Sequence, residues 1–393
     1  MASGTGTARV ATSEAGAGAA PLFGAEVYRD RVRRAAELTR AADLDALVVA
    51  PGPDLRYLVG SRAETFERLT ALVIPATGDA RLVIARLEVP SLSSSAVGDL
   101  DIEVADWVDG DDAHALALAG LPSQPRIAVS DSMPALHVIP LARHTGATPQ
   151  LATDVLRELR MIKDAAEIDA LRRAGAAIDR VHARMGDWLI PGRTEREVAA
   201  DIAAAILEEG HTEAAFIIVG SGPNGADPHH EFSDRVIERS DIVVVDIGGP
   251  VEPGYNSDST RTYCFDDPPA DIADAYAALL EAQRAAVAAV RPGVSASSID
   301  AAARDVLAAR GLAERFIHRT GHGIGLSVHE EPYIVGGNDI PLRAGMAFSV
   351  EPGVYVSGHW GARIEDIVIV TDDGCESVNN RPHELVRLDG SNS

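Results

Sequence analysis

Two aspartates flank a predicted turn in the segment VVVDIGGPVEPGYNSDSTRTY, residues 243–263. If this segment is a hairpin centred on Glu252, Asp246 and Asp258 are direct cross-strand partners, with Cβ atoms about 4.5–5.5 Å apart on one face. Like charges in such positions destabilise a hairpin unless a positive charge lies between them. The pair therefore predicts a bound cation, although an isolated aspartate at a strand end is usually structural.

A second acidic pair follows the same pattern in FSVEPGVYVSGHWGARIEDIVIV, residues 348–370. Glu351 and Glu365 are symmetric about Gly358, which lies in the turn-like stretch SGHWG. Two hairpins that each oppose two carboxylates make a poor structural motif, because both pairs repel. The same arrangement is well suited to hold cations.

One histidine, His322 in RTGHGIG, is expected to join these acids, because glycines on both sides permit close approach of the backbone. Four carboxylates and one imidazole suit two divalent cations that share bridging oxygens. This mixture of oxygen and nitrogen donors favours Mn, Co, Fe or Zn over a soft metal. The predicted metal ligands are Asp246, Asp258, His322, Glu351 and Glu365.

The combination of these motifs (VDIGG, SDSTR, GHGIGLSVHE, SVEPGVY and RIEDI) resembles the pita-bread metallopeptidases, which include prolidase, aminopeptidase P and methionine aminopeptidase. The resemblance spans residues 155–385, and the smaller preceding domain is similar to the creatinase-type N-terminal domain of the prolidase branch. It implies that Asp246 binds the first metal, that Asp258 and Glu365 bridge the two metals, that His322 is the single imidazole ligand and that Glu351 is a terminal ligand. The interval between the two aspartates is one residue longer than is usual in the family. This difference affects the predicted pairing register of the hairpin more than the assignment of the two aspartates as ligands.

The resemblance also implies roles for residues outside the ligand set. His229 in GADPHH matches a histidine near the scissile carbonyl, in preference to its neighbour His230, and His329 in SVHEEP matches one near the leaving group. Arg363 resembles an arginine that orders the site, and Phe216 resembles an apolar wall of the substrate pocket. A hairpin salt bridge and a core aromatic are the simpler interpretations of these last two residues.

Such a site would hydrolyse a peptide bond. Two cations acidify a shared water and polarise the carbonyl, Glu351 acts as general base and then acid, and His229 and His329 donate to the oxyanion or the departing amine. The resemblance implies hydrolysis of the bond before proline in Xaa-Pro dipeptides or short peptides, with Mn or Co as the metal. The open alternatives are aminopeptidase P activity on longer Xaa-Pro peptides, another hydrolase or lyase on the creatinase-type scaffold, and a non-catalytic binding protein.

The elements that position these residues alternate between helix and strand signals, which is typical of a layered α/β protein. We expect a disordered tail over residues 1–22, an α/β creatinase-like N-terminal domain over residues 23–152, and an α+β pita-bread catalytic domain over residues 153–393. The last of these contains one long charged helix over residues 157–185.

Helix starts that open with Pro-Gly and place a Thr or Ser two residues later recur in the second domain, as Pro-Gly-Arg-Thr in residues 191–210 and Pro-Gly-Val-Ser in residues 292–311. Thr194 and Glu197 form a predicted capping box in the first copy, and both copies stop at a glycine. The constant offset of 101 residues predicts an internal pseudo-twofold duplication.

The composition limits the classes of molecule that the protein is expected to bind. The 393 residues carry a formal net charge of −24, which disfavours nucleic acid and anionic membranes. The first twenty residues lack the pattern of a signal peptide, and only two cysteines occur, Cys264 and Cys375. We therefore expect a cytoplasmic protein. Its expected partner is a short proline-containing peptide, and the resemblance implies a homodimer.

Overall fold

The computed structural model describes residues 23–64 and 67–388 and divides into two compact units between Arg160 and Met161. The tail predicted over residues 1–22 lies outside the described residues. Among the helices of the described residues, none is long and apolar enough to cross a membrane.

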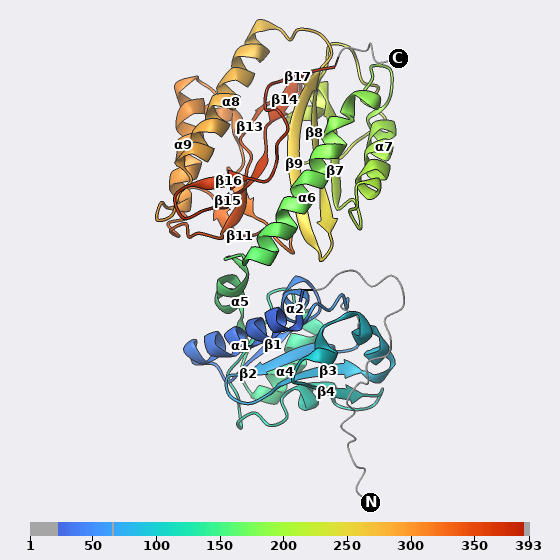
Figure 1. Cartoon of the computed structure of the whole chain (residues 1–393), viewed down its shortest axis with the longest axis vertical. Coiled ribbons are helices and arrows are strands. Elements are labelled where there is room, and N and C mark those ends of the chain that lie inside the picture. Colours follow the sequence, from blue (N-terminus) through green and yellow to red (C-terminus); the bar gives the residue numbers. More distant parts are fainter. Residues whose placement is uncertain (1–22, 65–66, 389–393) are drawn as a thin grey trace, which may run out of the picture. The chain divides into compact units, whose positions relative to one another are not determined.

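The first unit is an α/β domain built on one mixed sheet (Figure 1). The sheet has the order β4-β3-β2-β1-β5-β6, in which β1 runs antiparallel to β2 and parallel to β5. Its inner strands β1, β2, β3 and β5 are short apolar runs that are largely buried on both faces, as expected where helices cover a sheet, whereas the edge strands β4 and β6 are more exposed. Its elements are α1 (Ala25–Ala41), β1 (Ala46–Val49), α2 (Pro53–Val59), β2 (Ala71–Pro75), β3 (Ala80–Ala85), β4 (Ile102–Trp107), α3 (Ala113–Ala117), β5 (Ile127–Val129), α4 (Ala135–Thr145), β6 (Gln150–Leu151) and α5 (Thr153–Arg160).

The helix predicted over residues 157–185 is in fact two helices, because α5 stops at Arg160 and α6 (Ala165–Ala183) begins five residues later. Asp164 causes the new start: its carboxylate accepts the amide of Glu167, and the Glu167 carboxylate accepts the amide of Asp164. In a continuous helix these two amides would bond within the helix. At a new helix start they lack such partners, and the capping box supplies them.

Helix α5 belongs to the first unit, so the division lies eight residues after the boundary expected at residue 153. Tyr57 donates to the carbonyl of Leu159, and Arg160 forms a half-buried ion pair with Asp54. Both contacts hold α5 on the preceding domain, whereas its charged, strongly amphipathic sequence suggested the start of the next one.

The second unit is an α+β domain in which α8 and α9 lie on one side of the strands and α6 and α7 on the other (Figure 1). Its sheets have the orders β17-β9-β8-β7 and β11-β10-β12-β15-β16, and β13 pairs with β14 alone. Besides α6, its elements are α7 (Glu195–Glu208), β7 (Phe216–Ser221), β8 (Ile242–Val251), β9 (Tyr255–Cys264), α8 (Ala270–Ala289), α9 (Ala296–Ala309), β10 (Gly321–Gly323), β11 (Glu330–Ile334), β12 (Ala347–Val350), β13 (Gly353–Val356), β14 (Trp360–Arg363), β15 (Asp366–Val370), β16 (Cys375–Ser377) and β17 (Val386–Arg387).

The predicted duplication is visible in the helices. α7 and α9 have 14 residues each and start 101 positions apart, and each follows a longer helix. Thr194 and Ser295 cap them in the same way, each accepting a backbone amide three residues later. The same local sequence signal therefore builds both halves.

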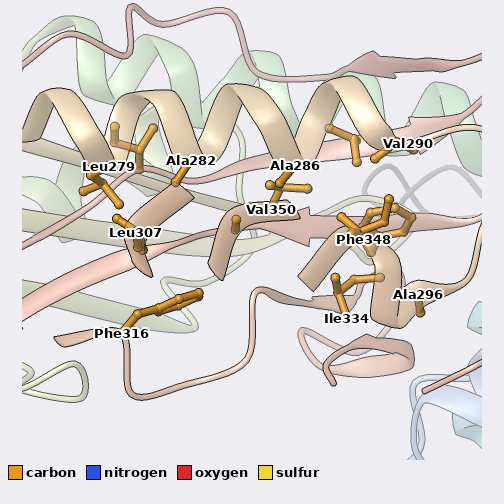
Figure 2. Close-up of a cluster of buried hydrophobic side chains, with 14 of the residues drawn as sticks. Leu279, Ala282, Ala286, Val290, Ala296, Leu307, Phe316, Ile334, Phe348 and Val350 are labelled. Atoms are coloured by element: carbon orange, nitrogen blue, oxygen red, sulfur yellow. The ribbon is translucent and has the colours of Figure 1, made fainter. Parts of the chain in front are cut away.

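Alternate side chains of the strands in the second unit face the hydrophobic core and the opposite, polar side of the sheet. On β12, Phe348 and Val350 pack against Leu279, Ala282 and other apolar side chains of α8 and α9, as Figure 2 shows. Ser349, between them, points the other way, to His322 and Glu351. Since successive strand residues face opposite sides, the strands that form the core must also present polar residues to a second face.

Gly175, in the middle of α6, offers a test of this packing. An added Cβ would lie 2.7 Å from the carbonyl oxygen of Val378 and 2.8 Å from its side chain. Alanine normally stabilises a helix by about 1 kcal/mol relative to glycine. We expect Gly175→Ala instead to destabilise the protein by about 1–3 kcal/mol through overpacking, measured by chemical denaturation.

Ala176, exposed on the same helix, provides the matched control. Ala176→Gly should cost only the intrinsic helix preference, about 1 kcal/mol. A rise in stability for Gly175→Ala would contradict the close approach of α6 to residue 378.

Candidate active site

A cavity of about 840 Å³ lies within the second unit, and every residue predicted for the site lines it. Strands β7, β8, β9, β10 and β14 and the loops between them supply its walls. The predicted residues that line it are Phe216, His229, Asp246, Asp258, His322, His329, Glu351, Arg363 and Glu365.

The first predicted register is wrong by two residues. Asp246 pairs with Thr260, and Asp258 pairs with Gly248, so the two aspartates are diagonal neighbours on one face and not direct partners. The reason is the turn: Val251 pairs with Tyr255, which leaves a three-residue loop centred on Pro253. This three-residue loop lies at the tip of the hairpin, away from the acids.

The second predicted register is right, but the ladder is interrupted at the acids. Val350 pairs with Asp366 and Gly353 with Arg363, both symmetric about Gly358. At the interruption the backbone amide of Glu365 donates to Thr260 on β9, and that of Glu351 donates to Thr320 beside β10. The break therefore sends one glutamate to the aspartate hairpin and the other to the strand of the histidine.

His322 lies at the centre of these acids. Its Nε2 is 3.3 Å from Glu351 Oε1 and 3.6 Å from Asp258 Oδ2. One ligand atom each from His322, Asp258 and Glu365 lie within 4.8 Å of one another. The flanking glycine at position 321 is required, because a Cβ there would be 1.8 Å from the carbonyl oxygen of Ser349.

The electrostatics of the site are those of crowded, buried acids. Burial, with repulsion from neighbouring carboxylates, raises the pKa of Asp258 and Glu365 well above their usual values. Burial also raises the pKa of Glu351 to about 7 and lowers that of His322 to about 3. Without a further positive charge, this cluster is stable only when it is partly protonated.

The residues present fit divalent cations. Asp246 Oδ1 is buried and has no hydrogen-bond partner, which is unusual for a carboxylate oxygen and leaves it available as a ligand. The other donors are carboxylate oxygens and one neutral imidazole, the set that Mn, Co, Fe and Zn accept. A bound cation would supply the positive charge that stabilises these carboxylates in their ionised form.

Arg363 is the one counter-charge that contacts an acid of the cluster among the described residues. Its guanidinium donates to Asp246 Oδ2 at 2.5 Å, to the Tyr355 hydroxyl at 2.8 Å and to Thr260 Oγ1 at 3.1 Å. Thr260 in turn donates to Glu365. These bonds order two of the acids, while direct contact between Arg363 and a substrate stays a prediction.

Three further predicted residues lie around the acids. The His329 ring lies 4.1 Å from that of His322, edge to face, and burial, together with the nearby guanidinium of Arg319, lowers the pKa of His329. His229 lines the cavity, whereas its neighbour His230 turns away and bonds to buried Glu195. The sequence could not decide between these two histidines from spacing alone.

Phe216 also lines the cavity, and its ring lies over the backbone of Gly248. A Cβ at position 248 would be 2.5 Å from the ring. The first glycine of VDIGG is thus needed to leave room for the ring of Phe216.

His318 is a cavity residue that the sequence reasoning missed. Its Nδ1 donates to the carbonyl of Arg319, so its Nε2 accepts from the Tyr355 hydroxyl at 2.9 Å. Burial lowers the pKa of His318 to about 3, and the neutral ring thus connects the cavity to Tyr355 and Arg363. A signal was available, since His318 precedes His322 by four residues.

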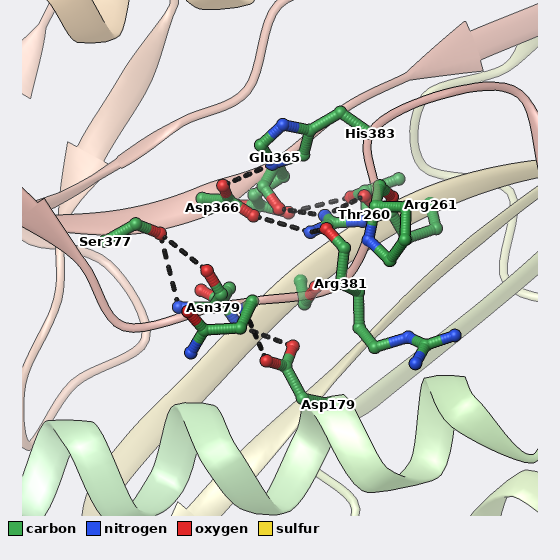
Figure 3. Close-up of polar contacts among 12 residues, drawn as sticks. Asp179, Thr260, Arg261, Glu365, Asp366, Ser377, Asn379, Arg381 and His383 are labelled. Carbon is green, nitrogen blue, oxygen red and sulfur yellow. Dashed lines mark hydrogen bonds and ion pairs between the residues drawn. The ribbon is translucent and has the colours of Figure 1, made fainter.

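Arg261, the arginine of SDSTR, was also given no role, and it clamps the site from behind (Figure 3). Its buried guanidinium donates to the carbonyl of Glu365 and to the carboxylate of Asp366, whose other oxygen lies 2.6 Å from His383 Nε2. It also donates to the carbonyl of Arg381. Arg261 faces away from the cavity because it alternates with Asp258 and Thr260 along β9.

Comparison with known proteins agrees with this geometry. Residues 169–372 match metallopeptidase family M24, and residues 31–162 match the creatinase/prolidase N-terminal domain. The chain is 64% identical over 365 residues to the probable dipeptidase PepE of Mycobacterium tuberculosis, covering 93% of this chain and 97% of that protein. It is 32% identical over 364 residues to the Xaa-Pro dipeptidase of Pyrococcus horikoshii, covering 92% and 100%.

Among solved structures, the crystal structure of dipeptidase PepE from Mycobacterium ulcerans matches with a TM-score of 0.91 at 64% identity, over 94% of this chain and 100% of that one. The predicted fold is therefore confirmed: a creatinase-like N-terminal domain precedes an α+β pita-bread domain. The chain belongs to metallopeptidase family M24 and is a metallopeptidase that depends on divalent metal ions.

Proposed function

We propose that this metallopeptidase cleaves short peptides, that it prefers Xaa-Pro dipeptides, and that it uses two divalent cations. The observation that carries the proposal is the convergence of three buried carboxylates, the partly buried Glu351 and the buried His322 in one cavity of about 840 Å³. The relatives named dipeptidase and Xaa-Pro dipeptidase support the substrate class.

We assign the cation ligands to Asp246, Asp258, His322, Glu351 and Glu365. When bound, two divalent cations would lower the pKa of water and polarise the scissile carbonyl. The free oxygen of Asp246 and the raised pKa values of Asp258 and Glu365 support this assignment.

The chain's own groups handle the protons. Glu351, whose pKa burial raises to about 7, can take the proton of the attacking water and pass it to the departing nitrogen. His229 and His329 line the same cavity and can donate N–H bonds to the oxyanion or to the leaving group. His329 is neutral at pH 7, because burial lowers its pKa, and so it acts as a donor through its N–H and not as a cation.

The selection of proline would depend on shape. A bond to proline nitrogen has no N–H, so recognition must use the ring and the ends of the peptide. Phe216, Ile217, Ile218 and Val328 line an apolar part of the cavity wall, and we infer that the proline ring binds there. From the resemblance we further infer that the metal is Mn or Co, that the protein is a homodimer, and that it is cytoplasmic.

The direct test is a panel of Xaa-Pro dipeptides and Xaa-Pro-Yaa tripeptides with the Mn- or Co-loaded protein. We expect proline release from the dipeptides, and Asp258→Asn should lower kcat/KM by at least about 100-fold, because the cation loses a shared ligand. Elemental analysis should show fewer cations per chain in this variant.

Asp234→Asn is the matched control, because Asp234 is an exposed carboxylate of the same unit that pairs only with Arg196 among the described residues. It should retain both activity and cations. The proposal is wrong if the dipeptides stay intact and Asp258→Asn changes neither activity nor cation content.

A second prediction concerns pH. The raised pKa values mean that the metal-free folded protein holds protons which the unfolded chain releases above about pH 4. Its stability therefore falls as the pH rises through the folded pKa values, of which that of Glu351 is about 7. A cation replaces those protons, so its binding should tighten with pH.

Thermal unfolding with and without Mn measures this effect. We expect the gain in Tm on adding Mn to be about 2–4 °C larger at pH 8 than at pH 5.5, which corresponds to about 1 kcal/mol. Asp258→Asn should lose most of the gain at both pH values. An equal gain at both pH values in the unaltered protein would contradict cation binding by these carboxyl groups.

A further inference from the structure

Arg319 is one of two arginines that line the cavity. The side chain is half-buried, and its Cζ lies 4.5 Å from the centre of the Tyr333 ring. Within residues 23–64 and 67–388, the guanidinium has no ion pair and donates no hydrogen bond to another residue. Because arginine normally finds a carboxylate or a carbonyl when it is partly buried, this guanidinium is a candidate ligand-binding group.

The backbone around Arg319 is held firmly. Its carbonyl accepts the Nδ1–H of His318 at 2.7 Å, and the next residue, Thr320, donates from both its amide and its hydroxyl to buried Asp300. Tyr333 is fixed as well, because it pairs with His322 across β10 and β11. Stacking on a fixed ring orients a guanidinium while it leaves the N–H groups at its edge available to a ligand.

The other arginine of the cavity wall, Arg363, contrasts with Arg319. Its donors contact Asp246, Tyr355 and Thr260, and it is almost fully buried. The two arginines are the cavity-lining side chains that always carry a positive charge. An anionic group that enters this acid-rich cavity therefore has Arg319 as its available partner.

Arg319 also lies near the proposed leaving-group histidine. Its positive charge is the second cause, after burial, of the lowered pKa of His329. In a dipeptide, one Cα joins the departing nitrogen to the terminal carboxylate, so the carboxylate carbon is only about 2.5 Å from that nitrogen. A cationic side chain that binds this carboxylate must therefore lie beside the residue that donates a proton or hydrogen bond to the departing nitrogen. Arg319 lies in this position, beside His329.

We propose that Arg319 binds the free α-carboxylate of a dipeptide substrate and thereby selects dipeptides over longer or amidated peptides. This proposal rests on the proposed peptidase function and deepens it by assigning the residue that reads the C-terminus. Tyr333 acts as a positioning residue, because it orients the guanidinium and does not itself contact the carboxylate.

The test compares each Xaa-Pro dipeptide with its C-terminal amide, which has the same scissile bond and lacks the charge. The Mn-loaded protein should prefer the acid to the amide by roughly 10- to 100-fold in kcat/KM, as expected for a charge-assisted pair. In Arg319→Met this preference should fall to within about threefold, mainly through KM for the acid, while hydrolysis of the amide is nearly unchanged.

Two variants control for folding and for charge. Arg319→Lys keeps the charge but loses the planar double donor, so it should retain an intermediate preference. Arg315→Met removes an exposed arginine that does not line the cavity, and it should behave as the unaltered protein. Tm and cation content are measured for every variant, so a misfolded protein is recognised.

A binding measurement separates this proposal from the proposed function. A dipeptide analogue in which CH2 replaces the scissile carbonyl cannot be hydrolysed, and its acid and amide forms are titrated calorimetrically into the Mn-loaded protein. If no Xaa-Pro dipeptide is cleaved but the acid binds in an Arg319-dependent manner, the function is wrong and the role of Arg319 holds. If dipeptides are cleaved and Arg319→Met keeps the full preference for the acid, only the role of Arg319 is overturned.

Discussion

Repulsion among buried carboxylates is the constraint on which the rest of this structure depends. Asp258, Glu351 and Glu365 share one buried cluster, and each has a raised pKa because burial and its neighbours disfavour its charge. Among the described residues, the counter-charge nearest to them is Arg363, which pairs with the adjacent Asp246, and the ring of His322, which lies 3.3 Å from Glu351, is neutral. The mutual repulsion of these acids favours their separation. The backbone of the fold must therefore hold them together.

The backbone meets this demand through strand alternation and an interrupted ladder. On β8, Val243 and Val245 pack with apolar residues of the helices α6 and α7, while Asp246 faces the cavity. The break after β12 places Glu351 beside β10 and Glu365 beside β9, so neighbouring segments hold the two glutamates. Behind them Arg261 binds the carbonyl of Glu365, on the face away from the cavity. The same apolar packing that stabilises the unit thus holds the acids in place.

Much of this could be predicted, because hydrophobic periodicity and the acid–glycine motifs are local signals. The strands, the duplicated helices and the cavity position of Asp246, Asp258 and His322 followed from them. The register of the first hairpin could not be predicted, because it depends on how three turn residues close around Pro253. Arg319 was missed for a different reason: its role depends on a ring at position 333 that approaches it only in the folded chain.

The clamp by Arg261 has a consequence for the order in which the site can form during synthesis. The predicted ligands end at Glu365, yet Arg261 also binds the carbonyls of residues 381 and 382, and His383 contacts Asp366. A nascent chain that has emerged from the ribosome only as far as Glu365 holds every acid of the cluster but not the segment that braces them. The contacts that brace the Glu365–Asp366 segment are therefore complete only after residue 383 has also emerged.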